Sequence, residues 1–167
     1  MAETLERNPH STVRPEWLAL RTEAILEPEL KIVDPHHHLW DRQDNRYLFH
    51  DLLADMNAGH NVVSTVFVQC RTMLRADGPT ALAPLGEVEF VTGIAAMSAS
   101  GVYGAARACA GIVAGADLQL GDQVAPVLEL MAHSAGGRLR GVRNPVVWHS
   151  SPDVQSSTAT PPPEGLM

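Results

Sequence analysis

The chain has 167 residues, of which 12 are Lys or Arg and 19 are Asp or Glu, so its formal net charge is −7 at pH 7. This length suits one domain with its own core, and a content of 45% apolar and 19% charged residues is typical of a soluble globular protein. We expect no secretory signal, membrane span or nucleic-acid surface, because the sequence shows no basic start with an apolar run, no span of roughly 20 apolar residues and no Lys/Arg cluster. Cys70 and Cys109 have no C-x-x-C partner, which predicts reduced thiols in the cytoplasm.

The first quarter of the chain predicts one helix, one strand and a loop. Residues 1–13 are polar and are expected to be a loose lead-in. Apolar residues recur at helical spacing over 15–26, with a proline in the first turn and Pro28 after the end. The β-branched run 30–34 predicts a short buried strand, and the polar segment 41–47 predicts a loop.

The middle of the chain alternates between helical and strand patterns. A short helix is predicted over 50–56, and the nearly continuous Val, Phe and Thr run over 61–69 predicts a strand covered on both faces. A loop follows over 71–79. An apolar stripe over 85–98 predicts a helix, and 110–116 predicts a third strand that its glycines weaken.

The last part adds a helix over 122–133, a strand over 139–147 and a Ser/Thr/Pro-rich tail over 150–167. Strands that alternate with helices indicate parallel β/α units. At about 31 residues per unit, four units correspond to half of a (β/α)8 barrel. We therefore predict an α/β fold, the N-terminal half of a TIM barrel over 31–149, after a lead-in with one helix over 1–30. An open doubly wound sheet is the alternative, and it is disfavoured because no glycine-rich phosphate loop follows the first strand.

Three consecutive histidines follow the first predicted strand. Side chains at i and i+2 of an extended chain point the same way, so His36 and His38 should share one face while His37 points to the other. The carboxyl end of a barrel strand is where barrel enzymes carry their chemistry, and two imidazoles can bind one Zn²⁺ at about 2.0–2.1 Å. Asp34 could orient one of these rings. A loop run of histidines without a ligand is the alternative.

Several segments agree with one known family. DPHHHLWD, RYLFHDLLAD, NVVSTVFVQC, GEVEFVTGIAAMSASG, CAGIVAGADL and LRGVRNPVVW resemble, in this order, the amidohydrolase-related family. Within it, the chain is similar to the metal-dependent TIM-barrel hydrolases that include the sugar-lactone and pyrone-dicarboxylate lactonases. The resemblance runs from about residue 32 to the end of the chain.

The resemblance implies a hydrolase that opens a lactone or a related C–O or C–N bond of a small molecule. His36 and His38 would match the first-strand ligands of a divalent metal, expected to be Zn²⁺, although some lactonases of this group need no metal. Gln69 and Arg143 would lie at the ends of the second and fourth strands and bind substrate, since an arginine can hold a carboxylate with two hydrogen bonds. The alternatives are a backbone-bonded strand end for Gln69 and a surface ion pair for Arg143.

The chain departs from the family in length. Family barrels are roughly twice as long, and their later ligand histidine and aspartate general base belong to the second half, so the resemblance implies an N-terminal part with no catalytic base of its own. The alternative function is an inactive half-barrel whose open sheet edges promote homo-oligomers or partner binding. A small structural zinc protein is disfavoured, because Cys70 and Cys109 lack zinc-finger spacing.

Overall fold

The computed structural model describes residues 14–42, 45–146 and 149–151. The chain divides into two compact units, one over Ala24–Asn144 and one formed by the two ends of the chain. The second unit contains the four-residue helix α1 (Pro15–Leu18). The sheet, the remaining helices and the candidate site all belong to the unit over Ala24–Asn144.

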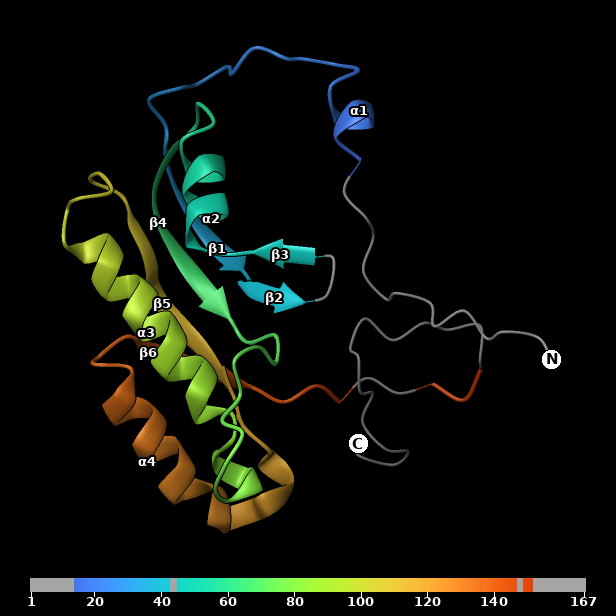
Figure 1. Cartoon of the computed structure of the whole chain (residues 1–167), viewed down its shortest axis with the longest axis vertical. Coiled ribbons are helices and arrows are strands. Elements are labelled where there is room, and N and C mark those ends of the chain that lie inside the picture. Colours follow the sequence, from blue (N-terminus) through green and yellow to red (C-terminus); the bar gives the residue numbers. More distant parts are fainter. Residues whose placement is uncertain (1–13, 43–44, 147–148, 152–167) are drawn as a thin grey trace. The chain divides into compact units, whose positions relative to one another are not determined.

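Four parallel strands form the centre of this unit (Figure 1). They are β1 (Lys31–His37), β4 (Asn61–Val68), β5 (Arg107–Gly115) and β6 (Leu139–Arg143), and they lie side by side in that order. β-branched residues dominate β4 because such side chains pack well on a pleated sheet. The predicted α/β class and the four adjacent parallel strands are confirmed.

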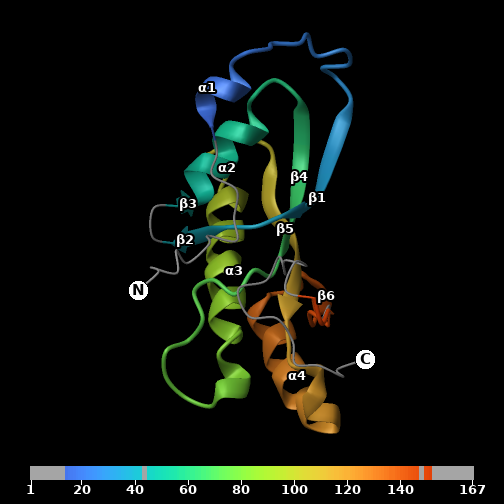
Figure 2. The ribbon, with the colours of Figure 1, turned by 90° about the vertical axis from the view of Figure 1, so that its right-hand side faces the viewer.

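Helices connect the strands and cover the sheet. α2 (Phe49–Met56) follows a small hairpin after β1, α3 (Leu85–Ala99) joins β4 to β5, and α4 (Ala125–Ser134) joins β5 to β6. Short 3-10 turns precede two of them, at Thr80–Leu82 and Leu118–Val124. Figure 2 shows α2 and α3 on the same side of β1, β4 and β5.

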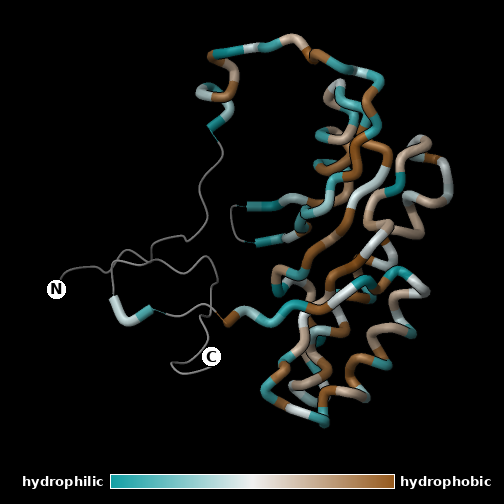
Figure 3. The backbone as a smooth tube through the Cα atoms, turned by 180° about the vertical axis from the view of Figure 1, so that it is seen from behind, coloured by the Kyte–Doolittle hydropathy of each residue, from teal (hydrophilic) through white to brown (hydrophobic). Residues whose placement is uncertain are grey.

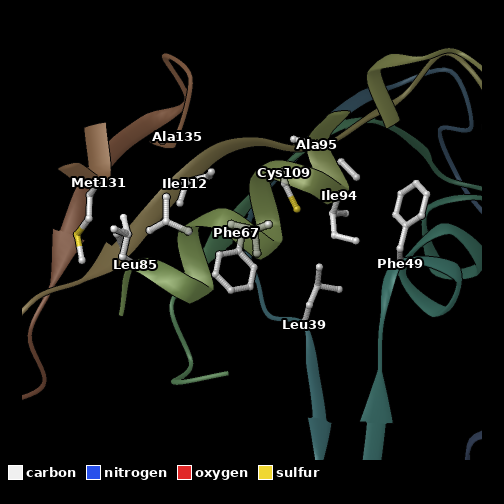
Figure 4. Packing of buried hydrophobic residues seen from close by; sticks show 14 of the residues in the cluster. Leu39, Phe49, Phe67, Leu85, Ile94, Ala95, Cys109, Ile112, Met131 and Ala135 are labelled. Carbon is white, nitrogen blue, oxygen red and sulfur yellow. The ribbon is translucent and has the colours of Figure 1, made fainter. Parts of the chain in front are cut away.

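The core lies between the sheet and these helices (Figure 4). Phe67 of β4 and Ile112 of β5 are fully buried, and the inner face of α3 packs against them. Burying each such side chain contributes about 1.5–3 kcal/mol of transfer free energy. The same cluster contains Leu39, Phe49, Leu52, Met56, Leu85, Val88, Val91, Ile94 and Met131.

By length and composition alone, the segment Thr80–Ala99 is apolar enough to cross a membrane, although no such stretch was expected from the sequence. A core helix of a soluble protein passes the same test. The α3 residues Val88, Val91 and Ala95 are buried in the core cluster, which is the arrangement of a helix packed on a sheet.

The predicted helix over 15–26 is wrong beyond its first turn. Only Pro15–Leu18 is helical, and residues 19–30 have no regular secondary structure. Leu20 and Leu26 are 78% and 92% exposed, so the apolar stripe has no surface to pack against. A short helix without such packing is not stable in water.

The predicted loop over 41–47 is also wrong. Trp40–Arg42 (β2) and Asn45–Tyr47 (β3) pair as an antiparallel hairpin. The Trp40 indole NH donates to the Asn45 side-chain oxygen at 2.9 Å, and the Trp40 ring stacks at a tilt on Tyr47. Such aromatic cross-strand pairs stabilise a hairpin whose sequence is otherwise polar.

The other differences concern the ends of elements. β1 continues through His37, three residues beyond the prediction, and β5 begins at Arg107 instead of residue 110. The helix predicted over 122–133 begins at Ala125, after a 3-10 turn that Gly121 breaks with φ of +56°. β6 ends at Arg143; residues 147–148 and 152–167 lie outside the described residues.

The strands are staggered across the sheet. His37 pairs with Phe67, Phe67 with Ile112, and Ile112 with Leu139. The end of β1 is therefore level with the start of β6. A stagger of this kind accompanies strands that tilt relative to the axis of a barrel.

Candidate functional site

The side chains of His36 and His38 meet at the carboxyl end of β1. Their Nε2 atoms are 3.2 Å apart, and the two rings are arranged edge to face with centroids 4.9 Å apart. Two nitrogen ligands of one tetrahedral ion, each at about 2.0–2.1 Å, lie about 3.3–3.4 Å from each other. The spacing therefore suits two ligands of one metal ion.

The orientation of His38 is held by the neighbouring strand. Its Nδ1 lies 2.7 Å from the carbonyl oxygen of Val68, at the end of β4. A carbonyl only accepts, so Nδ1 carries the hydrogen and the Nε2 lone pair is directed at His36. A ring NH bonded to a carbonyl is the support that metal-binding histidines commonly have.

Burial lowers the pKa of His38, and the hydrogen bond to Val68 opposes this effect. The charges of His36, Arg143 and Arg42 lower the pKa further. The His38 ring is therefore held in the neutral form, which is the form that binds metals.

His37 points into the core instead. Its Nε2 is 2.8 Å from Thr65 Oγ1 and 3.9 Å from Cys109 Sγ, and its ring packs edge-on against Phe67. The side chain is only 8% exposed, and burial lowers its pKa to about 4. The rings of His36 and His38 thus lie on one face of the strand and the ring of His37 on the other, as strand alternation predicts.

The two predicted substrate-binding residues are in contact with each other. The guanidinium Nη2 of Arg143, the last residue of β6, donates to the backbone oxygen of Gln69 at 2.5 Å. Gln69 is 3% exposed, and its NH donates to Val113 at 2.8 Å. The buried Nε of Arg143 has no hydrogen-bond partner among the described residues.

Gly115 of β5 gives Gln69 its room. A Cβ atom at position 115 would lie 3.2 Å from Gln69 Cγ and 3.3 Å from its Cδ. The Gln69 side chain therefore lies across β5, beside the strand that carries Arg143. Their role in binding a substrate stays a prediction.

Arg42 belongs to this group, although the sequence pattern placed it in a loop. Its Nη2 donates to the Cys70 backbone oxygen at 3.0 Å, and its guanidinium lies 5.5 Å from the centroid of Trp40. Together with Arg143 it puts positive charge beside His38. The signal in the sequence was the two-residue spacing of Trp40 and Arg42, which is typical of a strand.

A buried carboxylate fixes the loop that leaves β4. Glu87 Oε1 of α3 accepts hydrogen bonds from the backbone NH groups of Cys70 at 2.8 Å and Thr72 at 3.1 Å. Burial raises the pKa of Glu87, which is 2% exposed. Arg71 and Met73 have φ values of +64° and +47°, so the loop depends on these contacts to hold an unfavourable backbone.

Among the described residues, no group of three His, Cys, Asp or Glu side chains is placed to hold a metal ion. The geometry thus supplies two ligands. A cavity of about 490 Å³ lies elsewhere, at the amino ends of β4 and β5, and its lining includes Glu29, His60, Asn61 and Ala105. It therefore lies at the other ends of the strands from His36 and His38.

Comparisons with protein-family models, with curated proteins and with solved structures found no match. The resemblance to amidohydrolase-related proteins therefore depends on the sequence segments alone.

Proposed function

We propose that this chain provides the first four β/α units of a TIM-barrel hydrolase that opens a lactone or a related C–O or C–N bond. One observation carries the proposal: the His36 and His38 Nε2 atoms converge to 3.2 Å at the carboxyl ends of parallel strands. β/α barrels bind substrate at the carboxyl ends of their strands. The resemblance of the DPHHHLWD segment to metal-dependent lactonases supports the same interpretation.

The residues of the chain suggest a division of tasks. His36 and His38 would hold a divalent metal, which in such a site polarises a carbonyl and lowers the pKa of water. The Val68 carbonyl orients His38 for this task. Arg143 and Arg42 place positive charge beside His38, where it would favour an anionic substrate group. We assign no residue of this chain as the general base.

The test is zinc binding to the metal-stripped chain, measured by calorimetry and by metal analysis after dialysis. His36→Ala and His38→Ala should each weaken zinc binding by at least about tenfold, since loss of even an outer partner of a ligand costs 10–100-fold. His133→Ala, at an exposed position of α4, is the matched control and should bind as the parent does. Equal zinc affinity in the parent, His36→Ala and His38→Ala would exclude the metal site.

Activity is the second measurement. Two imidazoles are half of a tetrahedral ligand set, and a missing general base costs about 10²–10⁴ in rate. We therefore expect sugar and aromatic lactones to be hydrolysed slowly or not at all by the 167-residue chain, with or without Zn²⁺. Turnover at an ordinary enzyme rate by a monomer, abolished in His36→Ala, would show that four units already carry a complete site.

The alternative is an inactive half-barrel that binds a partner through its sheet edges. The observation in its favour is that β1 and β6 each pair with one neighbour among the described residues. A chain that neither binds zinc nor hydrolyses lactones would favour this alternative.

A further inference from the structure

The two edges of the sheet are the strongest feature that the proposed function does not use. Within the described residues β1 pairs only with β4, and β6 pairs only with β5, so each has backbone groups without a ladder partner, although in β1 Pro35 has no NH and the His36 NH donates to Asp34 Oδ1 at 3.0 Å. Val33, in the middle of β1, is 55% exposed. Open edges of this kind pair with other strands unless they are protected.

The face opposite the helices carries both apolar and charged side chains. Figure 3, which colours the backbone by the hydropathy of each residue, shows long brown, apolar stretches along the strands. Gly111 of β5 faces this side together with Val66 and Arg140, since a Cβ at position 111 would lie 3.2–3.4 Å from their side chains. The helices leave this face uncovered (Figure 2).

The two edges carry opposite charges. Glu29, Lys31 and Asp34 give the β1 edge one net negative charge, whereas Arg138 and Arg140, just before and within β6, give its edge two positive charges. The ion pairs of the described residues are Arg21–Glu23 and Arg75–Glu89, so none of these five has an oppositely charged partner there. The acidic edge of one molecule is therefore complementary to the basic edge of another.

We propose that two copies of this chain pair edge to edge, β6 of each beside β1 of the other, and close an eight-stranded parallel barrel. A two-fold axis along the barrel keeps all strands parallel and satisfies both edges of both copies, with none left for a third. The sheet faces opposite the helices then meet inside the barrel. In this arrangement a second copy takes the place of the four further units that the proposed hydrolase barrel would have.

The stagger of the strands predicts the register of the new contact. An eight-stranded β/α barrel has a shear of about eight residues, which is about four for each half. His37 is level with Leu139 across the four strands of one copy. Because the shear of each half is about four residues, the residue of the second copy's β1 that lies level with Leu139 is about four residues before 37, which is Val33. Asp34 of that copy then comes next to Arg140.

The mass of the full chain in solution is the first test. Light scattering after size exclusion should give twice the 18.0 kDa of one chain. Val33→Lys puts a charge on the open edge and should give the monomer mass, because an edge lysine blocks strand pairing. Val102→Lys, at a position that is 80% exposed in the turn before β5, is the matched control and should stay dimeric. Circular dichroism checks that both variants are folded.

Crosslinking tests the register. Val33 and Leu139 are separated by two strands within one copy, so a short thiol crosslinker cannot join cysteines placed there within one molecule. A chain with both Val33→Cys and Leu139→Cys should give a covalent dimer, and Val33→Cys alone should give none, because the two copies of β1 lie on opposite sides of the barrel. Cys70 and Cys109 are half-buried and buried, and the parent chain measures their background.

Three results would overturn the inference. A monomer at all concentrations would show that the edges do not pair. A crosslinked dimer from Val33→Cys alone would show that β1 pairs with β1. A ladder of trimers and larger species from the double variant would show open-ended pairing instead of a closed pair.

Discussion

His37 is a histidine that the fold keeps neutral. The ring is buried with Thr65 and Cys109, and its Nδ1 has no hydrogen-bond partner among the described residues. Its pKa is lowered from 6.5 to about 4, because a charged imidazole would lose its hydration there.

The folded state should therefore lose stability as the pH falls from 7 to 4. In this window the unfolded chain takes up a proton on His37 that the folded chain does not, so the free energy of unfolding falls by about 3 kcal/mol. His37→Gln removes this titration and should flatten the pH dependence, measured by urea unfolding in the presence of a chelator. His133→Gln should keep the slope of the parent, and an equal slope in His37→Gln would contradict the assignment.

The sequence was informative about residues where strand alternation decides direction. Side chains alternate between the two faces of a strand, which predicts that His37 points away from His36 and His38, and the structure confirms this. The partners of these rings could not be predicted, since Thr65 and Cys109 come from strands far along the chain. Arg42 was missed because its polar segment was interpreted as a loop, although the spacing of Trp40 and Arg42 is typical of a strand.

At the scale of elements, Gly86 allows α3 and the loop before it to pack closely against each other. A Cβ on Gly86 would lie 2.5 Å from the carbonyl oxygen of Met73 and 2.7 Å from the NH nitrogen of Arg75. Both are backbone atoms of the loop that Glu87 also holds. The loop and the helix therefore approach more closely than any other residue type allows.

Gly86→Ala should destabilise the fold by about 1–3 kcal/mol, since overpacked backbone has to shift. Gly93 lies in the same helix and has nothing within 4 Å of its Cβ position. Gly93→Ala should therefore stabilise by about 0.5–1 kcal/mol, the helix propensity difference. Urea unfolding of the two variants measures whether each substitution raises or lowers the free energy of unfolding. A loss of stability in Gly93→Ala equal to that in Gly86→Ala would contradict this account.

Elements with a long apolar pattern were predicted well, and short ones were not. β4 and α3 lie within one residue of their predicted ends, because their side chains are buried as the pattern requires. The helix over 15–26 had the same kind of pattern but no surface to pack on, which local sequence does not reveal.

At the scale of the molecule, pairing of the sheet edges should make stability depend on concentration. A dimer that dissociates on unfolding gains stability by mass action, so its midpoint temperature rises with protein concentration. We expect a higher midpoint at each tenfold increase for the parent chain and a constant midpoint for Val33→Lys. Calorimetry at several concentrations is the measurement, and a constant midpoint for the parent would speak against the pair.

The parallel order of the four strands could be predicted from the alternation of strands and helices, together with the handedness of their connections. Closure into a barrel could not, because it depends on what meets β1 and β6. The stagger of the strands is a sign of curvature that the sheet itself provides.

The contact between His36 and His38 has a consequence for which ring nitrogen of His36 carries the hydrogen. Since His38 keeps its hydrogen on Nδ1 for the Val68 carbonyl, a hydrogen bond between the two Nε2 atoms needs the hydrogen of His36 on Nε2. If both Nε2 atoms held an ion, His36 would have to be in its other tautomer, with that hydrogen on Nδ1. His36 is exposed, so water can carry the exchange, whereas His38 is set in advance. The two adjacent rings would thus capture an ion in sequence, His38 first.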